Sequence, residues 1–321
     1  MTKRLGLRPL DEEYITMGMA AWGKPNIVDK MKNMFVKDYE RVEFKQNFHR
    51  GIDSQLFDDY LDFTIAASTQ EVAETFIKSV MKRARDFGWS DNLVYGGGVA
   101  LNCLANRFLG DYFDRIWILP NPGDAGSSLG ASALDYGGRV DWSNAYLGHN
   151  ISGDYPVHDI MDELLSNSIV GVASGRAEFG PRALGNRSLL ADPRGADIKD
   201  RVNEIKQRQK FRPFAPVILE ELADQYFEMP LGWNKSPYMQ SVSVCKYPEQ
   251  YPAIVHIDGT SRVQTVGKDD SGIRKLLEAW YDRTGCPLLL NTSLNIRGEP
   301  MVNDIGDAAR FEKTYGVKVC T

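Results

Sequence analysis

The sequence predicts a mixed α/β protein made of two consecutive units. Its 321 residues suffice for two domains of the usual size, roughly 100 to 200 residues each. Helical and strand patterns alternate between residues 68 and 137, and a second alternation starts at residue 168. Turn-forming residues dominate 139–167, so we place the link there. We therefore predict a first domain over 1–150 and a second over 168–321.

Residues 1–60 show no pattern of a core of their own, although 42–53 are typical of a strand entering a turn. A helix is predicted from Ser68, which is a suitable cap, to Gly88, which is a suitable stop. Short links then join a buried strand, a helix, a strand and a second helix, at 92–95, 99–109, 115–120 and 125–137.

The second unit repeats this alternation with longer apolar runs. A helix is predicted over 273–285, between segments with strand character. Strands are expected within 168–176, 211–222, 236–247, 257–266 and 287–300.

Composition excludes several classes of protein. The chain carries 38 Lys and Arg against 43 Asp and Glu, a formal net charge of −5. An acidic chain is a poor candidate for sequence-independent binding to nucleic acid or to membrane surfaces. It has no apolar run of the roughly 20 residues that a membrane helix needs, and no signal peptide. We expect a cytoplasmic protein.

Cysteine and histidine spacing does not predict a metal site within this chain. Zinc sites usually pair their ligands at short spacings, which these residues lack. We expect reduced thiols and, if a metal is bound, ligands from another segment or another chain. The residues are Cys103, Cys245, Cys286, Cys320, His49, His149, His158 and His256.

Two glycine-rich turns in the first unit are candidate ligand sites. Gly97 and Gly98 lie between a strand and a helix, where backbone amides could bind phosphate, with Asn102 one turn later. The same glycines would also suit a tight turn, and neither the dinucleotide fingerprint nor the P-loop motif fits. Asp124 begins the next helix, where it would cap the helix or bind a metal.

Arginines gather in the stretch GRAEFGPRALGNRSLLADPR, residues 175–194. Guanidinium groups bind phosphate oxygens bidentately, and glycine, proline and phenylalanine neighbours indicate held rather than solvated side chains. The cluster therefore predicts a site for a small anion. We expect Arg182 to contact it, and some of Arg176, Arg187 and Arg194 to hold the loop through carboxylates such as Glu178 and Asp192. Further members are Lys206, Arg208, Arg212, Arg262 and Arg297.

The segment NTSLNIRGEP follows an apolar run, at the end of a predicted strand. Open α/β sheets bind ligands at such strand ends, although a polar turn would have the same composition. Ser293 lacks the motif of a serine nucleophile.

These motifs resemble the O-carbamoyltransferases of the nodulation-protein and antibiotic-tailoring type. GGGVALNCLANRFL, NPGDAGSSLGA, GRAEFGPRALGNRSLLADPR, FRPFAPVILEE, HIDGTSRVQTV and PLLLNTSLNIRGEPMV occur in the order expected for that family. The resemblance implies the second lobe of an actin-like, RNase H-like ATP-binding domain, similar to the tRNA threonylcarbamoyltransferase. A domain resembling threonylcarbamoyl-adenylate synthase would follow it.

The resemblance also implies a two-step reaction. Carbamoyl phosphate and ATP, the latter with Mg²⁺, would give carbamoyl-adenylate, and the carbamoyl group would pass to a hydroxyl of a small molecule. Arg182, Lys206 and Arg212 would be the catalytic residues. They would bind carbamoyl phosphate and the adenylate together with Arg262, Asn291, Thr292, Ser293 and Arg297. Gly97, Gly98 and Asn102 would bind ATP, and Asp124 would bind a divalent metal such as iron.

The chain departs from the family at its start. Members carry a further N-terminal portion with paired histidines that complete the metal site. We therefore expect a separate N-terminal polypeptide as partner, or a truncated or interrupted chain. Two other functions stay open: carbamoyl transfer to tRNA or modified DNA, and a non-catalytic nucleotide-binding subunit.

Overall fold

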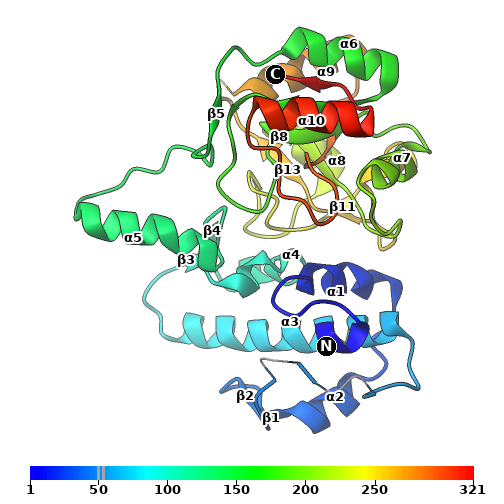
Figure 1. Ribbon diagram of the computed structural model, residues 1–321. Helices are drawn as coiled ribbons and strands as arrows, with labels where there is room; N and C mark the ends of the chain where they lie inside the picture. Colours follow the sequence, from blue (N-terminus) through cyan, green and yellow to red (C-terminus); the bar gives the residue numbers. More distant parts are fainter. Residues whose placement is uncertain (49–50, 53–54, 270) are drawn as a thin grey trace.

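The computed structural model describes residues 1–48, 51–52, 55–269 and 271–321. Figure 1 shows two parts, one above the other. The long helix α3 (Asp62–Asp86) runs through the lower part, and a sheet lies inside the upper part. Helix α5 (Ser127–Tyr136) projects to one side between them. This arrangement confirms the mixed α/β class.

A mixed six-stranded sheet forms the centre of the upper part, in the order β13-β9-β14-β8-β6-β15. The two outer pairs are parallel and the inner pairs antiparallel. Every residue of β6, β8 and β9 is buried. Strands buried on both faces need continuous apolar runs, which explains the patterns seen in the sequence. The strands are β6 (Ile169–Ala173), β8 (Arg187–Ala191), β9 (Ala215–Leu219), β13 (Gln264–Val266), β14 (Leu288–Ser293) and β15 (Val319–Cys320).

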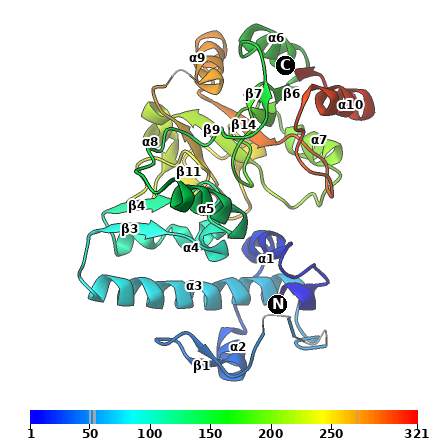
Figure 2. The ribbon, with the colours of Figure 1, turned by 60° about the vertical axis from the view of Figure 1, so that its left-hand side comes forward.

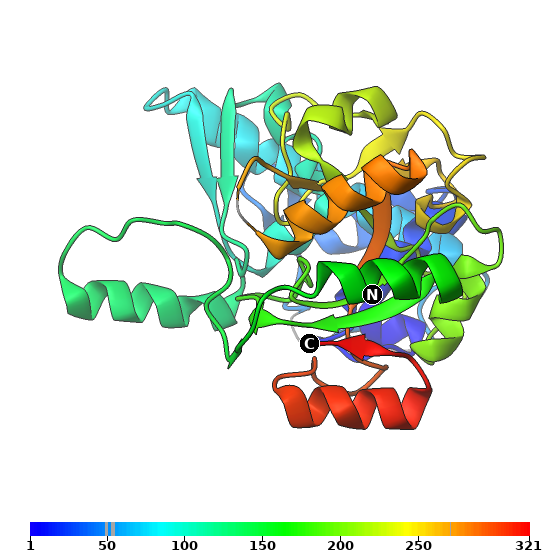
Figure 3. The ribbon, with the colours of Figure 1, turned by 90° about the horizontal axis from the view of Figure 1, so that it is seen from above.

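Three amphipathic helices cover this sheet. Helix α6 (Val157–Asn167) packs on α9 (Gly272–Thr284), and α10 (Ile305–Tyr315) packs on β15 and β6. Figure 3, a view from above, shows α6 and α9 on one side of β15 and α10 on the other. The predicted link 139–167 thus contains a core helix, because Ile160 and Leu164, one helical turn apart, are buried in the main core.

Helix α3 begins six residues before the predicted start. Ser68 is not its cap: it is fully buried, and its Oγ accepts a hydrogen bond of 3.3 Å from the Ile27 amide. Packing of the first turns of α3 against α1 and the short helix η2 therefore overrides the local cap signal. The predicted end is confirmed, since α3 stops at Asp86 and Gly88 has a φ of 66°.

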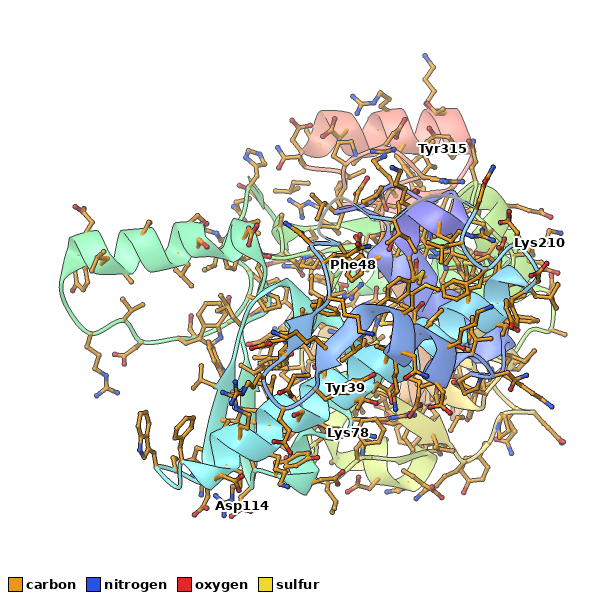
Figure 4. All side chains as sticks on the ribbon, turned by 90° about the horizontal axis from the view of Figure 1, so that it is seen from below. Tyr39, Phe48, Lys78, Asp114, Lys210 and Tyr315 are labelled. Carbon is orange, nitrogen blue, oxygen red and sulfur yellow. The ribbon has the colours of Figure 1, made fainter. Side chains whose placement is uncertain are left out.

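Residues 1–60 bury apolar side chains against α3, so the expectation that they lack a core was wrong. Ile27, Met31, Phe35 and Phe57 form a cluster with Ile65 of α3. Figures 2 and 4 show this layer on the underside of α3, with the labelled Tyr39 beside the helix in Figure 4. The elements are η1 (Thr2–Leu5), α1 (Glu13–Met19), η2 (Ala20–Trp22), α2 (Val28–Phe35), β1 (Val36–Asp38) and β2 (Glu43–Phe44).

Strands β3 (Asn92–Tyr95) and β4 (Arg115–Ile118) form a separate parallel pair. The strand at 92–95 is therefore found, but the prediction that it is buried was wrong, because its Val94 is 76% exposed. Trp117 of the neighbouring β4 is 41% exposed. Helix α5 is also found, and it buries none of its residues, with Leu134 83% exposed. Large apolar side chains are therefore exposed on all three of these elements.

The predicted helix 99–109 is broken at Asn102. Its side chain accepts a hydrogen bond of 3.1 Å from the Ala105 amide and so starts a new helix. The pieces are η3 (Gly98–Leu101), α4 (Cys103–Asn106) and η4 (Leu109–Asp111).

The remaining elements are short. In the described part of the chain, no helix combines the length and apolar character needed to cross a bilayer. All four cysteines are buried free thiols. Of the four histidines, His49 lies outside the described residues. The short elements are η5 (Asp124–Gly126), β5 (Asn150–Ile151), β7 (Gly175–Arg176), α7 (Ile198–Ile205), η6 (Glu220–Leu222), α8 (Ala223–Tyr226), β10 (Phe227–Glu228), β11 (Ser243–Cys245), η7 (Pro252–Ile254) and β12 (Thr260–Ser261).

Candidate functional site

A cavity of about 560 Å³ opens where the end of β14 faces the start of α1. The fold brings together there all eight residues that were predicted for the second domain. They come from four separate segments: the arginine loop, the end of α7, the approach to β13 and the end of β14. They are Arg182, Lys206, Arg212, Arg262, Asn291, Thr292, Ser293 and Arg297.

Three guanidinium groups of this cavity lack a counter-ion among the described residues. Within the described ranges, no carboxylate forms an ion pair with Arg182, Arg212 or Arg262. The Arg262 Nε is buried without a hydrogen-bond partner. Burial, together with the charges of Arg262 and Arg212, lowers the pKa of Arg182 to about 9. A bound anion would relieve this repulsion, so the cavity is electrostatically suited to a phosphate.

Arg208 is a fourth cation of the same wall. Its Nε donates a hydrogen bond of 2.7 Å to Asn203 Oδ1, and its guanidinium lies 4.1 Å from the centre of the Phe214 ring. Burial and the charges of Arg212 and Arg262 lower its pKa well below the ordinary value. Because both contacts hold the guanidinium in place, Arg208 is a preorganised part of the cationic wall.

Lys206 is committed to the loop after β14. Its Nζ donates to the Ser293 carbonyl at 2.5 Å and to the Asn295 carbonyl at 2.7 Å, and it also contacts both side chains. Burial, and repulsion by Arg208 and Arg212, lower its pKa well below the ordinary value. In this geometry Lys206 shapes the loop, and a direct contact with substrate stays a prediction.

Asn291 presents an unsatisfied acceptor. Its Nδ2 donates to the Ala183 carbonyl at 3.1 Å and to Gln264 Oε1 at 2.8 Å, whereas its Oδ1 is buried without a partner. Ser293 Oγ donates to Asn295 Oδ1 at 2.6 Å. A buried acceptor without a donor is costly, so Asn291 Oδ1 is placed to receive a ligand N–H or O–H.

The N-terminal segment forms a wall of the cavity that our sequence analysis missed. Tyr14 lies under the guanidinium of Arg212, with 4.9 Å between the Arg212 Cζ and the ring centre. Glu12 Oε1 lies 3.3 Å from Arg297 Nη2, across 285 positions of the chain. No local pattern signals this role, because Arg8, Glu12 and Tyr14 read as an ordinary helix start.

The arginine loop is held from inside by Glu178. Its Oε1 accepts backbone hydrogen bonds from Leu184 at 2.7 Å, Asn186 at 2.9 Å and Arg187 at 3.3 Å. Burial raises the pKa of Glu178, against the opposing effect of these bonds. The expected carboxylate support of the loop is therefore present, with backbone amides as its main partners.

The other loop arginines stabilise structure. Arg187 is fully buried and donates to the backbone carbonyls of Ser174, His149 and Asn303. Arg194 forms the expected ion pair with Asp192, at 2.7 Å. Arg176 donates to the Leu147 carbonyl at 2.8 Å and the Gly148 carbonyl at 3.2 Å.

The residues predicted to bind ATP lie apart from this cavity. Gly97 has a φ of 95°, and its amide donates to the Pro122 carbonyl at 2.8 Å. Besides capping α4, the Asn102 side chain exchanges hydrogen bonds of 3.0 and 3.1 Å with Gln70. Their roles in ATP binding, like that of Gly98, stay predictions.

Asp124 is the first residue of η5, with an exposed side chain, and Gly123 holds the cap position, so the capping interpretation was wrong. A metal needs several ligands, and the described residues contain no group of three or more His, Cys, Asp or Glu side chains around a common point. The described residues therefore do not make a metal site by themselves.

Comparison with known proteins matches both parts of the chain. A family model described as "Carbamoyltransferase N-terminus" matches residues 1–133, and one described as "Carbamoyltransferase C-terminus" matches 161–320. The nodulation protein NolO of Bradyrhizobium diazoefficiens is 35% identical over 92% of this chain and 62% of its own length. The nodulation protein NolNO of Sinorhizobium fredii is 33% identical over 95% of this chain and 51% of its own length. The uncharacterized protein sll1178 of Synechocystis is 31% identical over 95% of this chain and 62% of its own length.

The chain spans between 51% and 62% of the length of these three relatives. Both family models match within this chain, the N-terminal one over residues 1–133.

Proposed function

The chain belongs to the carbamoyltransferase family, and we propose that it takes part in ATP-dependent transfer of a carbamoyl group to a hydroxyl of a small molecule. The observation that carries this proposal is the cluster of Arg182, Arg212 and Arg262, which have no counter-ion among the described residues. Carbamoyl phosphate and the triphosphate of ATP are the anions that the family's chemistry would supply to it.

In the proposed first reaction, carbamoyl phosphate, ATP and water give carbamoyl-adenylate, phosphate and pyrophosphate. The protein's part is to bind and orient two polyanions and to stabilise charge that develops on the oxygens in transfer. Arg182, Arg212 and Arg262 would bind the phosphate oxygens bidentately. Mg²⁺ is expected to accompany the triphosphate.

Two residues would keep this arrangement rigid without reacting. Lys206 joins α7 to the loop after β14, and it thereby sets the positions of Ser293 and Asn295. Tyr14 supports the plane of Arg212 from the N-terminal wall. Guanidinium groups that are held in place before the substrate binds need not reorient during the reaction. This preorganisation is the main source of electrostatic catalysis.

The test is release of pyrophosphate from ATP that depends on carbamoyl phosphate. Arg212→Ala should lower it by at least a hundredfold, because the variant loses a guanidinium that is partly shielded from water. Arg283→Ala, on the exposed end of α9, is the matched control and should leave it unchanged. Unchanged release in the Arg212 variant would refute the assignment of this cavity.

Transfer to a nucleic acid is the second candidate, and the net charge of −5 weighs against it. Activity on a small hydroxyl acceptor, with no binding of tRNA or DNA at low salt, would exclude this candidate. A third candidate, nucleotide binding without turnover, would be indicated by ATP binding in the absence of pyrophosphate release.

We also propose a partner segment for the face made by β3, β4 and α5. Val94, Trp117 and Leu134 are exposed on these elements, and a buried environment would suit them better. The expected occupant is a polypeptide that completes the first domain. Copurification of such a chain would support this proposal. A monomeric 321-residue chain that is fully active without one would contradict it.

A further inference from the structure

A smaller cavity of about 120 Å³ continues the phosphate cavity toward α1 and α4. The two cavities share Arg182, Arg208, Arg212 and Arg262 in their walls. The remaining wall of the smaller one is mostly apolar. Its volume suits only a few non-hydrogen atoms, so a group attached to a phosphate held by the arginines could enter it. The larger apolar side chains are Ile15, Met17, Leu104, Phe214 and Val242.

His256 contributes an imidazole to this wall. The residue is 8% exposed, and its Nδ1 lies 3.5 Å from Asp258 Oδ1. Thr260 fixes that carboxylate oxygen through its amide at 3.0 Å and its hydroxyl at 2.7 Å. Trp22 packs edge-on against the imidazole, with 6.3 Å between the ring centres. The ring therefore has a defined orientation.

The Asp258 carboxylate decides which imidazole nitrogen carries the proton. Burial raises its pKa, but hydrogen bonds from His256 and Thr260 outweigh burial and lower the pKa to about 2. An ionised carboxylate accepts from Nδ1–H, and in the tautomer that this contact selects the lone pair is on Nε2. His256 Nε2 is buried, and it has no hydrogen-bond partner among the residues described. It is therefore a prepared acceptor.

We propose that His256 Nε2 accepts a hydrogen bond from the amide N–H of bound carbamoyl phosphate, and so selects this substrate over acyl phosphates without an N–H. The inference rests on the proposed function of the larger cavity, the one lined by Arg182, Arg212 and Arg262. The arginines bind the phosphate end of any acyl phosphate, whereas the apolar cavity and His256 recognise the NH₂ group. His256 is then a specificity-determining residue, and Asp258 positions it.

Acetyl phosphate is the natural comparison, because a methyl group replaces the NH₂ at nearly the same size. Its binding would leave the buried acceptor unpaired, which costs about 1–3 kcal/mol. Since each 1.4 kcal/mol is a tenfold change in affinity, we expect carbamoyl phosphate to bind about 5- to 100-fold more tightly than acetyl phosphate. Sites built to pair a substrate N–H reject analogues that lack it for this reason.

The experiment measures calorimetric binding of three probes to the full chain: freshly dissolved carbamoyl phosphate, acetyl phosphate and inorganic phosphate. His256→Leu should bind carbamoyl phosphate and acetyl phosphate with equal affinity and leave phosphate binding unchanged. His256→Gln, whose carbonyl can accept, should recover part of the preference. His158→Leu, on the exposed face of α6, is the control and should behave as wild type.

Asp258→Ala provides a second route if the leucine variant fails to fold. It removes the acceptor of the Nδ1–H, so neither the position of the imidazole proton nor the ring orientation stays fixed, and this variant should lose most of the preference. If Asp258 had a purely structural role, its substitution would lower the binding affinity for all three probes equally, and that result would contradict the inference.

The outcomes separate this inference from the proposed function. If wild type binds phosphate and carbamoyl phosphate, and His256→Leu keeps the full preference over acetyl phosphate, the inference is wrong while the cavity assignment stands. Asn291 Oδ1 would then be the remaining acceptor to test. If wild type binds none of the three probes, the proposed function fails and the inference fails with it.

Discussion

Glu178 offers the sharpest test of how the arginine loop is held. One oxygen of this buried carboxylate accepts the amides of Leu184, Asn186 and Arg187. Glu178→Ala would leave three backbone donors without a partner in a region closed to water. Each unsatisfied buried donor costs about 1–3 kcal/mol, and because the three share one acceptor we expect a combined loss of about 3–5 kcal/mol. The thermal midpoint should fall by about 10 °C.

Glu178→Gln is the matched control, because its carbonyl oxygen can replace Oε1. We expect its free energy of unfolding to stay within about 1 kcal/mol of wild type at neutral pH. The measurement is urea unfolding followed by circular dichroism, together with phosphate binding to report the position of Arg182. A loss below 1 kcal/mol in the alanine variant would refute the reasoning. An equal loss in both variants would show that the charge matters, and not the acceptor.

The same pair predicts a pH dependence. Burial raises the pKa of Glu178 in the folded chain, so the folded state holds its proton to higher pH than the unfolded state. The free energy of unfolding of the wild type should therefore decline as the pH rises above 4.5, the ordinary pKa of the glutamate in the unfolded chain. The decline should end once the pH exceeds the pKa of Glu178 in the folded chain. The glutamine variant lacks this decline. If the difference in free energy of unfolding between wild type and Glu178→Gln did not change with pH, the Glu178 carboxyl would have the same pKa in the folded and unfolded chains.

Two further predictions concern other contacts. Gly110→Ala should destabilise the chain by about 2–3 kcal/mol in urea unfolding, because an added Cβ would lie 1.8 Å from the Leu231 carbonyl oxygen; Gly130→Ala, with open space around it, should be neutral. The pKa of Glu221 is lowered to about 2, chiefly by its hydrogen bonds from Arg274. The stabilisation from this pair, about 1 kcal/mol after solvent screening, should be present above pH 4.5 and lost toward pH 2. Urea midpoints of wild type and Glu221→Gln that differ equally at pH 7 and pH 3 would contradict this.

Much of the upper part could be predicted from sequence because its signals are local. Apolar runs such as 215–219 and 288–290 indicate strands buried on both faces, and the period of Ile273, Leu276 and Leu277 indicates a helix. The gathering of eight predicted residues in one cavity depends on strand ends, which the same local signals locate.

Local signals failed where a distant partner decides. Ser68 resembles a cap in isolation, but it lies inside α3 because α1 and η2 pack on the turns before it. The apolar segment 92–95 resembles a buried strand, but no second layer covers it in the described structure.

By itself, the sequence determined that arginines would meet on glycine-bent backbone near a polar strand end, because residue type and turn chemistry are encoded in neighbouring positions. Only the tertiary structure decided which cations are free to bind a ligand. Arg187 is occupied by carbonyls from 149, 174 and 303, and Lys206 by the loop after β14, whereas Arg182 and Arg262 have no such partner among the described residues. A guanidinium's availability depends on acceptors that are remote in the chain, and only folding brings those acceptors to it or leaves it unpaired.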